Sequence, residues 1–183
     1  MVFALSEVYP CEPDEEVLKL VEEFAEMVRW WAERARGFQG KDYTALRRAF
    51  YADWVKRWPE ANRQLIHTSA SVAASRVKLQ RSAEERPKSP DVEVSYAVLH
   101  PKMLKVVGGR LRVSLARGEY AYVHLKPEND YQQRLLRQAE DGLWRLGQAV
   151  LTKSWVLLTF TSYELDEMAF QAVQELLVDR RFS

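Results

Sequence analysis

The most informative segment of the sequence is residues 103–116, MLKVVGGRLRVSLA, in which two alternating apolar runs flank a pair of glycines. A glycine pair in this setting is a strong signal for a two-residue β-hairpin turn. If Val107 pairs with Arg110, the register places Lys105 opposite Arg112. The other face of the ribbon then holds the apolar pairs Val106–Leu111 and Leu104–Val113. We therefore expect a hairpin with one apolar face and one basic face.

Further strand patterns lie on both sides of this hairpin. Alternating or continuous apolar runs rich in Val, Leu, Tyr and Trp predict strands. They occupy residues 2–9, 92–98, 120–125, 143–152 and 154–160. Residues 128–141, ENDYQQRLLRQAED, interrupt this series as a short helix or a polar loop, and the helix is favoured.

Three helices are predicted between the first strand and the others. Apolar residues recur at helical spacing over 13–36, 42–58 and 60–82, and small residues crowd the third of these helices. Residues 83–90 form a linker, and 164–183 form a C-terminal helix. We predict an α+β fold in which a β-barrel-like domain, residues 1–10 plus 91–163, carries a helical insertion, residues 11–82.

Large aromatic side chains are assigned to the core rather than to a binding surface. The second helix carries a stripe at helical spacing, which more often packs than stacks on bases. This stripe comprises Tyr43, Leu46, Phe50, Trp54 and Trp58. Trp144 and Trp155 are expected to be residues of the barrel.

Composition and motifs exclude several classes of function. The chain has 183 residues with 27 basic and 26 acidic side chains, and its formal net charge is +1. One cysteine, Cys11, excludes an internal disulfide and any zinc site with two thiolates, and the three histidines have no nucleophile partner at informative spacing. No apolar run is long enough for a membrane helix. We expect a cytoplasmic protein without cofactor, metal or enzyme activity.

The charge distribution indicates a basic middle between two acidic ends. Residues 41–82 hold 9 basic and 3 acidic side chains, whereas residues 1–40 hold 4 and 9. A basic stripe broken by small residues can follow a phosphate backbone, although a solvated helix face has the same appearance. The candidate nucleic-acid-binding residues are Arg48 and Lys56 on the second helix, Arg63, His67, Lys78 and Arg81 on the third, and Lys105, Arg110 and Arg112 on the hairpin.

Several segments together resemble the N-terminal half of the TnpB-type (OrfB) transposon-associated proteins, which are RNA-guided nucleases. These are Tyr9-Pro10, the aromatic pair in residues 28–31, QLIHTSASVAASRVKL at 64–79, VGGRLRVSL at 107–115 and GQAVLTKSWVLLTF at 147–160. The resemblance implies a wedge-like β-barrel and an inserted helical recognition domain. In that family these parts hold a guide RNA and the DNA that it pairs with.

The chain also departs from that family. A RuvC-like nuclease needs three separated acidic residues for its metal ions, the first on an apolar strand, but here Asp166 lies in an acidic helical start. The zinc ribbon is absent too. We therefore expect a truncated or free-standing N-terminal half that binds RNA or DNA without cutting it, alone or with a separate nuclease polypeptide. The competing interpretation is a protein-interaction or oligomeric protein. The apolar stripe on the C-terminal helix either closes the barrel or forms an oligomer seam, and the sequence leaves both open.

Overall fold

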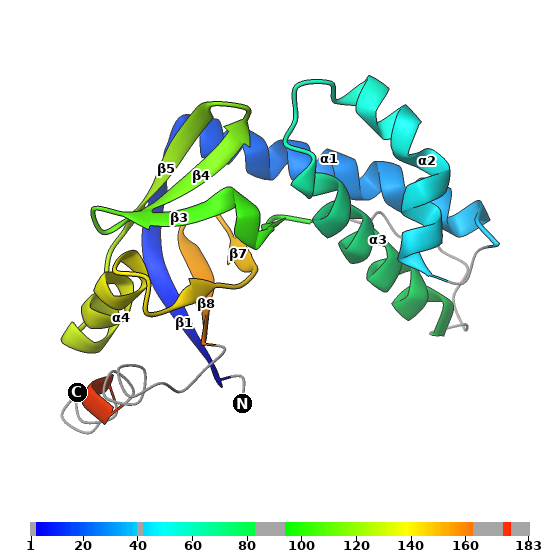
Figure 1. Cartoon of the computed structure of the whole chain (residues 1–183). Helices are drawn as coiled ribbons and strands as arrows, with labels where there is room; N and C mark the ends of the chain where they lie inside the picture. Colours follow the sequence, from blue (N-terminus) through cyan, green and yellow to red (C-terminus); the bar gives the residue numbers. More distant parts are fainter. Residues whose placement is uncertain (1–2, 40–41, 83–93, 163–173, 177–183) are drawn as a thin grey trace.

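The computed structural model describes residues 3–39, 42–82, 94–162 and 174–176, with side chains through Lys78 in the second of these ranges. Its described part is a mixed α+β structure in which an antiparallel sheet curls into a half-barrel (Figure 1). Three helices follow the first strand, as the hydrophobic periodicity predicts. The predicted fold class is confirmed.

The sheet is built from eight described strands. Their order is β2-β7-β8-β1-β5-β4-β3, every pair is antiparallel, and β6 pairs with β8 off this path. The strands are β1 (Phe3–Pro13), β2 (Ala97–Leu99), β3 (Leu104–Val107), β4 (Arg110–Ala116), β5 (Glu119–Leu125), β6 (Arg145–Leu146), β7 (Ala149–Leu151) and β8 (Trp155–Ser162). A short 3-10 helix, η1 (Pro101–Met103), lies between β2 and β3.

β1 holds the two halves of the sheet together. Residues 3–10 pair with β8, and residues 11–13 pair with β5. The strand is longer than the predicted 2–9 because its last residues find this second partner. One extended segment therefore joins the hairpin side of the sheet to the β7–β8 side.

The predicted hairpin is confirmed residue by residue. Val107 pairs with Arg110, and Lys105 pairs with Arg112. Leu111 and Val113 are fully buried, whereas Lys105 is exposed. The glycine pair thus sets a register that turns the apolar face of the ribbon to the core.

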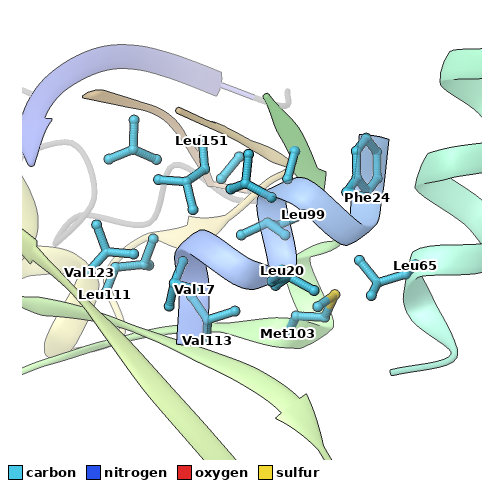
Figure 2. Packing of buried hydrophobic residues seen from close by; sticks show 14 of the residues in the cluster. Val17, Leu20, Phe24, Leu65, Leu99, Met103, Leu111, Val113, Val123 and Leu151 are labelled. Carbon is cyan, nitrogen blue, oxygen red and sulfur yellow. The ribbon is translucent and has the colours of Figure 1, made fainter. Parts of the chain in front are cut away.

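The helical insertion packs on the sheet through α1 (Glu15–Gly37). Figure 2 shows Val17 and Leu20 of α1 near Val113 of β4, and Phe24 further along α1 near Leu65 of α3 (Gln64–Ser82). α2 (Tyr43–Arg57) packs on α3. The buried side chains of helices and sheet form one hydrophobic cluster.

Small residues on α3 allow a close approach of α1. Ala70 and Ala73 are fully buried, and the Trp31 indole Nε1 donates a hydrogen bond to the Ser69 hydroxyl at 3.1 Å. A thin helix face therefore accommodates a large tryptophan and satisfies its polar atom.

Three sequence predictions need correction. Tyr43 is 41% exposed because it lies in the first turn of α2, at the rim of an open groove rather than between helices. Trp155 is 40% exposed at the start of β8, whereas Trp144 is buried. The third helix starts at Gln64 rather than at residue 60, since Asn62 Oδ1 accepts the Gln64 backbone N–H at 3.0 Å in a preceding turn.

Two strand and helix predictions shift in position. The strand predicted at 92–98 is β2, Ala97–Leu99, and its first residues, 92–93, lie outside the described part. The helix favoured at 128–141 is confirmed as α4 (Asp130–Glu140), whose Asn129 cap accepts the Gln132 backbone N–H at 2.9 Å. The linker 83–90 and most of the predicted C-terminal helix also lie outside the described residues.

The part of the C-terminal segment that is described, residues 174–176, is helical and contacts the sheet domain. Glu175 lies 3.8 Å from Arg134 of α4, and Leu176 is buried. These contacts favour covering of the barrel by this segment over an exposed oligomer seam at Leu176.

Candidate functional site

The candidate basic residues lie on α2, on α3 with its preceding turn, and on β3–β4. Arg48, Lys56, His67, Lys78 and Lys105 are exposed. Arg81 lies in α3, but its side chain is outside the described part of the structure. The local surroundings of these residues differ, and the surroundings decide which of them can meet a ligand.

Arg63 is held by the turn between α2 and α3. Its guanidinium donates hydrogen bonds to the carbonyl oxygens of Trp58 at 3.1 Å and Pro59 at 3.2 Å. It also lies 5.9 Å from the centre of the Trp54 ring. The carbonyls at a helix C-terminus lack intrahelical donors, and Arg63 supplies them. Part of its donor capacity is therefore used within the turn, although the residue is exposed.

The basic face of the hairpin carries tyrosines that sequence reasoning did not include. Arg110 lies 4.2 Å from the centre of the Tyr122 ring, and Arg112 lies 4.3 Å from that of Tyr120. Both contacts are diagonal across β4 and β5, because Arg112 pairs with Tyr122 and Ser114 with Tyr120. We call this surface the Arg–Tyr face and define it as Lys105, Arg110, Arg112, Tyr120 and Tyr122.

The Arg–Tyr face is open and carries unneutralised positive charge. Tyr120 is 50% exposed. None of the ion pairs among the described residues includes Lys105, Arg110 or Arg112. These three cations therefore have no carboxylate partner in that part of the chain. A guanidinium over an aromatic ring keeps its edge donors available while its motion is restricted.

An acidic residue marks one end of this face. Asp14 Oδ1 lies 3.0 Å from His124 Nε2, and Asp14 Oδ2 accepts the Tyr122 backbone N–H at 3.0 Å. His124 pairs with Arg110 across the strands. Asp14 thereby joins the start of α1 to β5.

A second group of cations meets where α2, α3 and η1 come together. We call it the His–Arg cluster and define it as Arg47, Arg48, His67, His100 and Lys102. Arg47 Nη1 is hydrogen-bonded to His67 Nδ1, and the ring centres of His67 and His100 are 6.0 Å apart. The Lys102 backbone N–H donates to His100 Nδ1 at 3.2 Å. Only Arg48 and His67 of this group were candidates from sequence.

Positive surroundings lower the pKa of both histidines in the His–Arg cluster. Partial burial lowers the pKa of His67 below its usual 6.5, and the charges of Arg47, His100 and Lys102 lower it further. The pKa of His100 is lowered by burial and then by Lys102. Both imidazoles are therefore neutral at neutral pH.

Metal-ligating side chains and the single thiol are the remaining chemical groups of interest among the described residues. No group of three or more His, Cys, Asp or Glu side chains among them could hold a metal ion. Burial raises the pKa of Cys11 to about 11, so its thiol stays protonated at neutral pH. No helix within the described ranges is long and apolar enough to cross a membrane.

Fold and surface together define the class: an α+β protein whose curled antiparallel sheet exposes a cationic, tyrosine-bearing face. No family model matches the chain, and no curated protein matches it. The resemblance to TnpB-type proteins stays a prediction that rests on the segments quoted above.

Proposed function

We propose that this chain binds RNA or DNA through phosphate contacts and does not cut it. The observation that carries the proposal is the Arg–Tyr face, where Arg110 and Arg112 lie over Tyr122 and Tyr120 at 4.2 and 4.3 Å. Arginine donors suit phosphate oxygens, and exposed aromatic rings suit bases. Their combination on one sheet surface supports a nucleic-acid ligand over a simple polyanion.

The face favours single-stranded nucleic acid over a duplex. A base stacks on a tyrosine only when it is free of its own neighbours, and the half-exposed Tyr120 ring offers such a surface. Lys105 and the two arginines lie on adjacent strands, β3 and β4, so successive phosphates of one strand can meet them.

The proposal agrees with the role that the resemblance to TnpB-type proteins implies. In that family a wedge-like β-barrel and its helical insertion hold RNA and DNA. We propose the same activity here without the nuclease chemistry, as in an N-terminal half that acts alone or with a separate nuclease polypeptide.

The experiment compares two double variants that each remove two positive charges. Arg110→Ala/Arg112→Ala changes the Arg–Tyr face, and Arg29→Ala/Arg137→Ala removes exposed arginines from α1 and α4. Fluorescence anisotropy with a labelled single-stranded RNA, the matching DNA and their duplex gives Kd over a range of salt concentrations. We expect the first variant to bind about tenfold more weakly and the second to bind like the wild type.

The salt dependence provides a second readout. About six phosphate contacts give a slope of roughly −4 to −5 in log K against log salt, and losing two of them reduces the magnitude by about 1.5. A slope near zero for the wild type, or an equal loss of affinity in both double variants, would overturn the proposal.

A second candidate function, protein–protein interaction, is supported by an exposed apolar patch on β1 and β8. Val8 is 48% exposed and Trp155 is 40% exposed, and they line one hollow together with Pro10. Contiguous exposed apolar residues are typical of interfaces. Light scattering after size-exclusion chromatography tests this: a dimer that Trp155→Ser converts to a monomer supports the interaction role, and a wild-type monomer argues against self-association.

A further inference from the structure

We infer that the His–Arg cluster is a binding site for a phosphate group, separate from the Arg–Tyr face. The site takes a tetrahedral dianion or a phosphodiester at the junction of α2, α3 and η1. This inference goes beyond the proposed function and does not depend on it.

The geometry of the cluster favours an anion. Arg47 and Arg48 from α2 and His67 from α3 line an open hollow of about 430 Å³, together with Tyr51 and Ile66. A hollow of this size accommodates a phosphate group with its water. The hollow itself is lined by α2 and α3, and His100, at the start of η1, adjoins it through His67, whose ring centre lies 6.0 Å from its own.

No carboxylate within the described ranges balances the charge of the cluster. Besides burial, the groups that act on His67 are the cations Arg47 and Lys102, and His100 when it is protonated, and none of them is acidic. Within the described ranges, no ion pair joins a carboxylate to any member of the cluster. Like charges held this close are costly unless an anion joins them. An oxyanion bound between these cations would offset their mutual repulsion, because each cation would attract it.

Hydrogen bonds within the cluster also fix which histidine nitrogens face a ligand. His67 Nδ1 and His100 Nδ1 both accept hydrogen bonds, from Arg47 and from the Lys102 backbone N–H. Each neutral ring must therefore carry its proton on Nε2. Neither Nε2 atom has a partner in the described part of the chain, so both N–H groups are available to an oxyanion.

The same arrangement makes binding dependent on pH. In the free protein the neighbouring cations disfavour the imidazolium forms, whereas a bound dianion favours them. Binding therefore takes up protons, and affinity rises as the pH falls towards the histidine pKa values. The groups involved are Arg47, Arg48 and Tyr51 from α2, His67 from α3, and His100 and Lys102 from η1.

The test uses the full chain with its three histidines as reporters. Long-range ¹H–¹⁵N spectra follow each imidazole from about pH 5 to 8 with and without sodium sulfate, at constant ionic strength set by sodium chloride. Sulfate is a tetrahedral dianion whose charge does not change over this range. We expect sulfate to shift the Nε2 signals and raise the pKa of His67 and His100.

His124 is the internal control, because its Nε2 lies 3.0 Å from Asp14 Oδ1 and it belongs to the other surface. Arg48→Gln and Lys102→Gln should weaken the apparent sulfate affinity roughly threefold each, and Arg29→Gln should leave it unchanged. Equal responses of all three histidines, or no response beyond that to chloride, would overturn the inference.

Two further measurements separate this site from the Arg–Tyr face and identify the source of the phosphate. The sulfate response should persist in Arg110→Ala/Arg112→Ala, and its disappearance there would contradict a separate site. A short RNA with a 5′-phosphate is then compared with the same RNA ending in a 5′-hydroxyl. A histidine response to the first alone assigns a terminal phosphate, an equal response assigns a backbone phosphodiester, and no response to either overturns the site.

Discussion

The guanidinium of Arg63 donates hydrogen bonds to the carbonyl oxygens of Trp58 and Pro59, at 3.1 and 3.2 Å. Arg110 instead lies over the Tyr122 ring, with no carboxylate partner among the described residues. Both are arginines in basic stretches of the sequence, yet Arg63 donates to the carbonyls of a turn, whereas Arg110 lies over an aromatic ring. Side-chain surroundings, rather than charge alone, therefore distinguish the arginine that caps a turn from those that we propose to bind phosphate.

We predict that Arg63→Ala lowers stability without lowering nucleic-acid affinity. The substitution removes one of two donors to the Trp58 carbonyl, which keeps the Ala61 backbone N–H, and the donor to the Pro59 carbonyl. It should reduce the free energy of unfolding by about 1 kcal/mol, since water replaces part of each lost bond. Urea unfolding followed by tryptophan fluorescence measures the change. Arg29→Ala, on the exposed face of α1, is the control and should have little effect. A large loss of RNA affinity in a stable Arg63→Ala protein would assign this residue to the binding surface instead.

At the scale of the element, the turn of the β3–β4 hairpin determines which side chains lie on the Arg–Tyr face. Gly108 and Gly109 have φ values of 58° and 71°, which suit the two-residue turn that matches the twist of the strands. Their conformation places Lys105 and Arg112 side by side on the outer surface. If the register of the β3–β4 pairing were shifted by one residue, these cations would point towards the core.

The same substitution should have opposite effects at two glycines. Gly108→Ala puts a side chain on a residue with positive φ and should destabilise the protein by about 1 kcal/mol or more. Gly37 ends α1 without positive φ, and open space surrounds the added methyl group, so Gly37→Ala should stabilise by about 0.5 kcal/mol. Thermal unfolding of both variants measures the difference. Equal destabilisation by both would contradict the turn geometry at Gly108.

At the scale of the whole molecule, α1 connects the two proposed binding surfaces. Its first turns cover the sheet behind the Arg–Tyr face, and its later turns pack on α3, which carries His67 (Figure 2). Asn62, in the turn before α3, also donates to the Ser114 carbonyl of β4 at 3.2 Å. The relative positions of the Arg–Tyr face and the His–Arg cluster therefore depend on one shared core.

We predict that helices and sheet unfold together. Leu20→Ala removes a buried side chain at the junction and should cost about 2–4 kcal/mol. Because the core is continuous, hydrogen exchange should become faster to the same extent in α3 and in β4. Mass spectrometry of peptides from both elements makes this comparison. Acceleration in α3 alone would show that the helical insertion unfolds independently.

Local patterns were sufficient to predict much of the fold and part of the site. The hairpin register and the pairing of Lys105 with Arg112 followed from turn chemistry and alternation, and α1 followed from helical periodicity. The tyrosines of the Arg–Tyr face could have been found in the same way, because Tyr120 and Tyr122 alternate within β5. Each of these features depends on residues that are close in sequence.

Other features were decided by the tertiary structure alone. His67 and His100 meet only because α3 packs on β2, which His100 follows, and β1 extends to Pro13 only because β5 is available as a second partner. Trp155 belongs to an apolar run but is exposed, since no described element covers its side of β8. Periodicity and turn residues report backbone preferences over a few neighbours. The free energy of burying the whole core decides which distant surfaces meet. This free energy depends on all the core residues together, so no local pattern can predict it.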